Sequence, residues 1–352
     1  VDGASVKLRL ARGSKPAWVF GNAGAGGFYR VEHDAATREG LVSRLDEALS
    51  AVERMALVGD QWALVRAGKA SLESFLDVAD ALGEESDYDV LDGLAAPLGL
   101  LDDQVVAPES AEQARYRAWI AGRFGPALGQ LGWTAAPAED DPTRLRRAAL
   151  VRLIGLVAEA PGILIEARRR LDEYVADRRS LEPNLADAVA ALAARVGDAA
   201  LYERYRGLVA EARTPHERRR FLLNLGSFRD RDSIRRTLEA VLTPEIPTQD
   251  VAFVLMRLFS NPAARKETWR FLQKRWTALS RRIPPLMISR LMESLPGLRE
   301  PRYAREVSAF FRSHPVAEAS RALRQALEVF RLNAELRKRT GPALSRWLEA
   351  RE

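Results

Sequence analysis

The chain has 352 residues, which by length corresponds to about two ordinary domains. Hydrophobic residues make up 47% of it and charged residues 29%, a balance typical of a folded protein rather than a disordered one. The absence of cysteine excludes disulfides, thiolate metal sites and a cysteine nucleophile. The net charge of +6 permits acidic partners, but the basic clusters at 168–170 and 218–220 stand beside acidic residues at helical spacing, which favours solvated helix faces.

The first 36 residues predict β-strands. Apolar residues alternate with basic ones over 6–10, Trp18 to Phe20 form a short apolar run, and alternation returns over 28–33 after the glycine-rich stretch 21–27. Two or three strands without a covering layer are marginal in water. We therefore expect them to be the end of a larger sheet.

From residue 37 onward the apolar residues recur with the helical period of 3.6. Asp141–Pro142, Asn261–Pro262 and the capping box from Thr214 to Glu217 predict helix starts. We expect about sixteen short helices with short connections, which forces neighbours to be antiparallel. The predicted fold is mainly all-α, a HEAT/armadillo-like superhelical array over 37–352, with a bend at 97–108 and a hinge at 137–141.

No catalytic or metal-binding motif is recognisable. His216 and Glu217 begin like a zinc-binding His-Glu-x-x-His helix, but Arg220 stands where the second histidine is needed, and a guanidinium cannot donate a lone pair to zinc. Nucleophile-elbow, P-loop and dinucleotide motifs are also missing. Trp269 and Trp276 share one helix face, so we interpret them as core rather than as a nucleic-acid stacking platform. We therefore predict no catalytic residue, metal or cofactor in this chain.

Localisation is predicted from patterns that are missing. The first residues show no signal-peptide pattern, and the most apolar stretch, 148–165, contains two charged residues and a proline. We expect a cytoplasmic protein.

Several short motifs, taken in order along the chain, carry a family resemblance. Their residues are Gly27, Phe28, Tyr29 and Arg30 near the start, then Gln249, Asp250, Asn261, Pro262, Trp269, Phe271 and Trp276. Together they resemble the aminopeptidase N family of zinc metallopeptidases, in its puromycin-sensitive-like or bacterial branch. The part resembled is the C-terminal helical domain with the last strands of the β-sandwich domain before it.

The resemblance implies a domain division and a role. Residues 1–36 would end the β-sandwich, and residues 37–352 would form the helical C-terminal domain. That domain would be non-catalytic in a parent enzyme that uses zinc to remove N-terminal residues from peptides. It would close over the active site and limit peptide access, and a basic inner wall would suit peptide carboxylates.

The resemblance also implies partners and limits. The partners would be the catalytic and β-sandwich domains of the same parent chain and peptide substrates, with no nucleic acid and no membrane. The family's zinc ligands belong to an earlier domain, so no metal or catalytic residue carries over to this sequence. Some relatives place a substrate-facing arginine just before the Asn-Pro pair; here Ser260 stands there, so that contact is not expected.

Two other classes of function stay open behind this hypothesis. One is a free-standing helical-repeat scaffold that binds protein partners, and the other is a basic HEAT-like nucleic-acid binder, whose affinity would fall steeply with salt.

Overall fold

The computed structural model describes residue 16 and residues 18–351, and this part of the chain is helical without a β-strand. The α-helices are α1 (Ala35–Val42), α2 (Leu45–Ala48), α3 (Ala51–Ala67), α4 (Leu72–Ala81), α5 (Tyr88–Leu100), α6 (Ala111–Leu131), α7 (Asp141–Arg152), α8 (Pro161–Ala176), α9 (Pro183–Arg195), α10 (Ala199–Glu211), α11 (Pro215–Asn224), α12 (Arg231–Ala240), α13 (Thr248–Ser260), α14 (Arg265–Arg282), α15 (Pro285–Ser294), α16 (Pro301–Ser313) and α17 (Ser320–Glu349). Short 3₁₀ or π segments lie between some of them, at Ala23–Ala25, Leu101–Val105, Leu153–Val157, Leu225–Ser227, Leu295–Leu298 and Ala317–Ala319.

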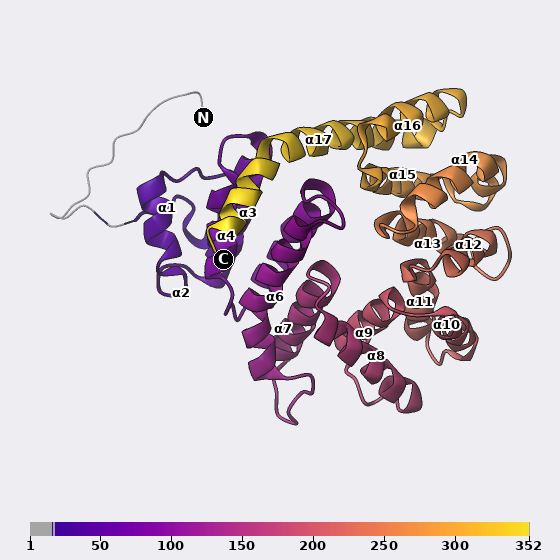
Figure 1. Ribbon diagram of the computed structural model, residues 1–352, viewed down its shortest axis with the longest axis horizontal. Helices are drawn as coiled ribbons and strands as arrows, with labels where there is room; N and C mark the ends of the chain where they lie inside the picture. Colours follow the sequence, from indigo (N-terminus) through magenta and orange to yellow (C-terminus); the bar gives the residue numbers. More distant parts are fainter. Residues whose placement is uncertain (1–15, 17, 352) are drawn as a thin grey trace.

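The helices pack in an array with two layers. The odd-numbered helices from α3 to α15 contact one another in succession and form the inner row, and α10, α12 and α14 lie on the outer rim (Figure 1). Since the inner helices share one direction along the row, their C-terminal ends gather at one edge of the array. The predicted all-α array is therefore confirmed, while its likeness to HEAT or armadillo superhelices stays a prediction.

Helix α17 closes the array. It has 30 residues, about 45 Å at 1.5 Å per residue, and runs from α15 and α16 back to the π segment Leu101–Val105, α4 and α6 (Figure 1). Trp347 near its end is buried, packs edge-on against Trp119 with 4.9 Å between ring centroids, and donates Nε1–H to Asp77. The last helix thus joins the two ends of the inner row.

The predicted strand over 28–33 is wrong. The segment is a loop that packs on α3, and Asp60 of α3 binds it: one carboxylate oxygen accepts the Val31 N–H and the other accepts Arg30, both at 3.0 Å. The alternating pattern therefore has a helix carboxylate, not a neighbouring strand, as its hydrogen-bond partner. Trp18 to Phe20 form no strand either, and the run predicted over 6–10 lies outside the described residues.

The glycine-rich stretch before it is a closed loop rather than a turn between strands. The Asn22 side chain donates to the Gly27 carbonyl and accepts the Gly27 N–H, and Gly24, at a positive φ of 64°, donates its N–H to Glu53 at the start of α3. Glycine is required at position 24 because other residues seldom adopt that backbone conformation.

The predicted starts of α11 and α7 lie at or next to the residues that cap these helices in the structure. Thr214 caps α11 by accepting the Glu217 N–H, as predicted, but Glu217 reaches back to the Arg213 N–H and not to the Thr214 amide. Asp140, one residue before the predicted Asp141, caps α7.

The predicted helix start at Asn261–Pro262 is confirmed in part. Asn261 ends α13 and α14 begins at Arg265, but the Asn261 side chain accepts the Ala263 N–H at 3.1 Å and its backbone carbonyl accepts the Arg265 N–H at 3.0 Å, so the turn that leads into α14 starts there. The predicted bend at 97–108 is wrong, since the chain is helical up to Val105, with Pro97 inside α5. The residues predicted as a hinge, 137–141, do lie in the loop between α6 and α7 and at the first residue of α7.

Among the described residues no single helix is long and apolar enough to cross a membrane; the pair Asp141–Val157 and Pro161–Ala176 satisfies that criterion only together and is bent by 119° at its break.

Candidate functional site

The C-terminal edge of the inner row carries a network of arginines and carboxylates, which we call the inner arginine cluster. Its members are Asp102, Asp103, Arg117, Glu159, Arg195, Arg229, Arg257, Arg265, Arg299 and Arg337. Carbonyls at helix C-termini lack intrahelical partners and carry partial negative charge, so this edge attracts cations. Arg195, for example, donates to the Leu156 carbonyl at 2.7 Å, and Arg337 donates to the Gln104 carbonyl.

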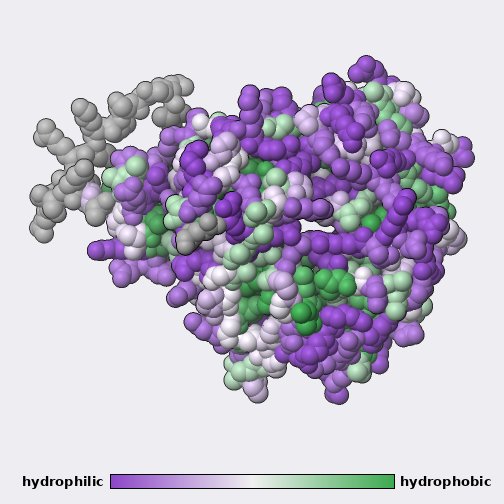
Figure 2. Space-filling view, viewed as in Figure 1, coloured by the Kyte–Doolittle hydropathy of each residue, from purple (hydrophilic) through white to green (hydrophobic). Residues whose placement is uncertain are grey.

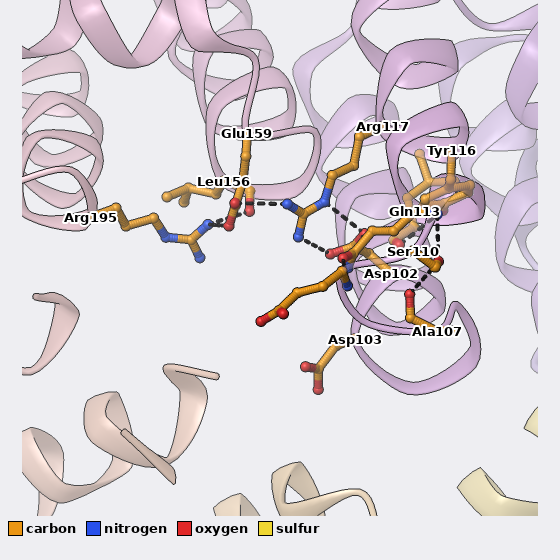
Figure 3. Close-up of polar contacts among 12 residues, drawn as sticks. Asp102, Asp103, Ala107, Ser110, Gln113, Tyr116, Arg117, Leu156, Glu159 and Arg195 are labelled. Atoms are coloured by element: carbon orange, nitrogen blue, oxygen red, sulfur yellow. Dashed lines mark hydrogen bonds and ion pairs between the residues drawn. The ribbon is translucent and has the colours of Figure 1, made fainter. Parts of the chain in front are cut away.

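Glu159 is the centre of the cluster. It follows the π segment Leu153–Val157 that ends α7 and has a positive φ of 48°. Its carboxylate accepts from Arg117 at 2.8 Å and Arg195 at 2.9 Å (Figure 3), and also from Arg229 at 3.1 Å. Desolvation opposes ionisation here, but the hydrogen bond from Arg229 and the charges of the three arginines outweigh it and hold the pKa of Glu159 below its ordinary value.

A second carboxylate pair ties the cluster across the array. Arg117 binds Asp102 bidentately at 2.9 and 2.8 Å (Figure 3), while Asp103 accepts from Arg265 of α14 at 3.1 Å. Asp102 and Asp103 both lie on the π segment after α5, so one short element connects residues more than 160 positions apart in the chain. The cluster thus forms part of the closure made by α17.

Beside Glu159 lies a recess with more positive than negative charge. Its lining includes Arg195, Arg229 and Arg257 together with Ser260 and Asn261. Glu159 neutralises one of the three arginines, and no ion pair or hydrogen bond in the described part of the chain engages the Arg257 guanidinium. Arg257 is exposed at the mouth of the recess, but desolvation by the surrounding protein still lowers its pKa, and desolvation together with the neighbouring arginines lowers the pKa of Arg195 to about 10. A bound oxyanion would relieve this excess charge.

The recess faces the inside of the array. Figure 2 shows the molecule hollowed near its centre, with hydrophilic residues at the rim of the hollow and a hydrophobic patch below it. The arginines can bind a carboxylate or phosphate group there through paired N–H donors. The recess contains no histidine or tyrosine, and its lining residues form no nucleophile–base pair.

The residues singled out from the sequence lie elsewhere, except for two. Asn261 and Pro262 line the recess, and the buried Asn261 amide donates to the Gly226 and Phe228 carbonyls at 3.1 and 2.7 Å. Asp250 is buried at the start of α13 and pairs with Arg219, next to the exposed Gln249.

Trp269 and Trp276, on α14, are 1% and 7% exposed, as expected of core residues, and Phe271 is half-buried. Among the first motif residues, Gly27 closes the Asn22 loop and Arg30 pairs with Asp60. The Phe28 ring is fully exposed, whereas the partly exposed Tyr29 folds back on the loop and donates its hydroxyl to the Gly21 carbonyl at 2.9 Å.

The basic clusters divide into two kinds. Arg168 and Arg169 pair with acidic residues on their own helix, as predicted for a solvated face. Arg220 is instead buried, where it binds Asp187 and the Tyr174 hydroxyl. The inner arginine cluster itself was missed, because its ten members come from nine separate places in the chain and no sequence pattern connects them.

Among the described residues, no three or more histidine, aspartate or glutamate side chains are placed to hold a metal ion together. His216 Nε2 lies 3.2 Å from Asp187, the same carboxylate that Arg220 binds, so the partial zinc motif presents a cation where a metal would sit. The residues present do not fit a zinc ion.

Several known proteins are similar in sequence to most of this chain. Aminopeptidase M1-A of Oryza sativa subsp. japonica is 29% identical over 331 residues, which cover 90% of this chain and 37% of the relative. Aminopeptidase 2 of Candida albicans is 20% identical over 94% of this chain, and the thyrotropin-releasing hormone-degrading ectoenzyme of Rattus norvegicus is 23% identical over 99%. The chain therefore spans a little over a third of the length of these relatives, and they do not resolve which branch it resembles.

The family match agrees with these relatives. The sequence pattern of the ERAP1-like C-terminal domain covers residues 18–332, from the loop before α1 into α17. The chain belongs to the ERAP1-like C-terminal domain family, found in aminopeptidases of the M1 type.

Proposed function

We propose that this chain is the non-catalytic C-terminal domain of a zinc aminopeptidase that removes N-terminal residues from peptides, and that it closes over the active site and controls peptide access. Its family and the names of its relatives support this proposal. The proposed partners are the catalytic and β-sandwich domains of the same parent chain, which would carry the zinc, and the proposed location is the cytoplasm.

The observation that carries the proposal is the unpaired positive charge of the recess. Arg257 lies at the C-terminal end of α13, one helical turn before Ser260, and both line the recess beside Arg195 and Arg229. A peptide whose N-terminus is at a distant active site has a free carboxylate at its other end, and arginine is the side chain best shaped to bind it. The inner wall would thus favour peptides whose carboxylate reaches it.

An exposed apolar surface supports contact with another part of a parent chain. Val19, Phe28 and Tyr29 of the first loop and Val52 and Met55 of α3 are all more than 40% exposed. Large apolar side chains gathered on one surface are typical of an interface. The surface lies where the described chain begins, so a β-sandwich domain preceding the helices would be adjacent to it.

The test compares peptides in the full-length parent. With Arg257→Ala, we expect KM for a peptide with a free C-terminal carboxylate to rise about tenfold, while KM for the same peptide amidated stays unchanged, because a charge-assisted hydrogen bond contributes about 1.5–3 kcal/mol. Arg321→Ala, an exposed arginine of α17, is the matched control.

Two outcomes contradict different parts of the proposal. If Arg257→Ala changed KM equally for both peptides, the recess would not bind the peptide carboxylate, but the domain could still control peptide access. A reading frame that starts at this chain, without a zinc-binding His-Glu-x-x-His helix upstream, would contradict the aminopeptidase itself and favour a free-standing scaffold.

A further inference from the structure

Helix α14 carries an unusual concentration of positive charge on the outer rim of the array. Its basic residues are Arg265, Lys266, Arg270, Lys274, Arg275, Arg281 and Arg282, against one acidic residue, Glu267. The excess over this one helix equals the net charge of the whole chain, +6. Arg265 belongs to the inner arginine cluster, Lys266 pairs with Glu300, and Arg282 donates to the Thr243 and Ile246 carbonyls. The other four, Arg270, Lys274, Arg275 and Arg281, are exposed.

A groove between α12 and α14 gathers part of this charge. Arg231 and Arg235 of α12 line it on one side, and Arg270, Lys274 and Arg275 of α14 line it on the other. All five side chains are exposed. Arg235 pairs with Asp232, whereas no ion pair or hydrogen bond in the described part of the chain involves the other four. Two carboxylates, Glu239 and Glu267, also line the groove and leave a positive excess.

The floor of the groove is apolar. Leu238 is buried and Phe271 is half-buried beneath the cationic rim. This combination differs from a solvated helix face, where charges pair along one helix, as Arg169 does with Glu166 and Glu173. Here, cationic side chains from both α12 and α14 line the same groove, and the floor of that groove is apolar.

The dimensions favour a short ligand. Arg231 and Arg235, like Arg270 and Lys274, are one helical turn apart, which is about 6 Å along each helix. A nucleic acid needs a longer track of cations and exposed aromatic rings on which bases stack. Trp269 and Trp276 of the same helix are buried, so they supply no such platform.

We propose that the groove between α12 and α14 docks a short acidic segment of a partner protein, in which carboxylates alternate with apolar side chains. The carboxylates bind Arg231, Arg270 and Lys274, and an apolar side chain rests on Leu238 and Phe271. Helices α12 and α14 lie on the outer rim of the array (Figure 1), and the groove shares no lining residue with the inner recess, so the inference stands independently of the proposed peptidase role.

The experiment measures fluorescence anisotropy of a labelled hexapeptide of alternating glutamate and leucine against the 352-residue chain at low salt. The same peptide with glutamine in place of glutamate shows what the carboxylates contribute. We expect the glutamate peptide to bind and the double variant Arg270→Ala/Lys274→Ala to weaken it about tenfold or more. Arg321→Ala/Arg324→Ala removes two exposed cations of α17 and serves as the control for net charge.

Each result decides the proposal. Weakening by the α14 variant alone supports it. Equal weakening by both double variants shows a non-specific charge effect and overturns it, as does equal binding of the glutamine peptide. A single-stranded oligonucleotide of the same charge is the third probe; if it binds more tightly than the peptide and loses affinity in the α14 variant, the groove is a nucleic-acid site and the acidic-peptide proposal is wrong.

Discussion

At the scale of single residues, Trp276 is one of the residues that carry the family resemblance, and its side chain packs in the hydrophobic core. Its ring packs edge-on against Phe310 at 5.8 Å and Phe311 at 5.2 Å between centroids, and 7% of the residue is exposed. Trp276→Ala should lower the free energy of unfolding by about 3–5 kcal/mol, because the cavity cannot collapse fully. Phe28→Ala, which removes a fully exposed ring, should change it by less than about 0.5 kcal/mol. Urea denaturation of both variants measures this, and a neutral Trp276→Ala would show that the side chain acts on the surface.

Glu159 is the residue whose charge matters most to the inner arginine cluster. Its pKa is lowered in the folded protein, so its contribution to stability is fully present above the unfolded value of about 4.3 and is lost as pH falls through the lower folded value. Glu159→Gln leaves three arginines facing one another and should cost about 3 kcal/mol at pH 7. The difference from the wild type should shrink below about pH 4, as the wild-type carboxylate becomes protonated. Denaturation across pH checks this; a difference that is independent of pH would mean that packing, not charge, explains the loss.

At the scale of elements, the sequence predicted what local chemistry controls. The helical period, the Thr214 cap and the burial of Trp269 and Trp276 follow from the neighbours of each residue within one or two turns. The strand over 28–33 failed because the partner of Val31 is Asp60, about thirty positions away, and alternation alone cannot distinguish a strand from an extended loop packed on a helix. The recess was out of reach for the same reason, since Glu159 and Arg229 are 70 positions apart.

The Thr214 cap makes a prediction at this scale. Its hydroxyl accepts the Glu217 N–H at 3.1 Å, so Thr214→Ala should lower the free energy of unfolding by about 1 kcal/mol, whereas Thr214→Ser should retain most of it. Thr214→Ala removes both the hydroxyl and the methyl group and Thr214→Ser removes the methyl group alone, so the difference between the two variants in thermal unfolding measures the cap. Equal destabilisation by both would mean that the methyl contact, and not the cap, stabilises α11.

At the scale of the whole molecule, closure by α17 separates this array from an open solenoid. In an open array each repeat contacts only its neighbours, so partial unfolding of one repeat does not affect distant repeats. Here Arg265 and Arg337 bind the π segment after α5, Arg339 donates to the Val65 carbonyl, and Trp347 packs on α6. The two ends of the inner row therefore depend on each other through α17.

Closure is tested by Trp347→Ala, with Trp276→Ala as a control of similar volume. Loss of the Trp347 ring removes its contact with Trp119 and its hydrogen bond to Asp77, so amide exchange should rise in α4, α6 and the last two turns of α17, which are far apart in the chain. Trp276→Ala should instead raise exchange in α14 and α16, where its own ring contacts lie. If Trp347→Ala left α4 and α6 protected, α17 would be an appendage of the last repeats. The curvature of the array would then have to come from the inner row alone, whose unbroken contacts from α3 to α15 do not join its ends.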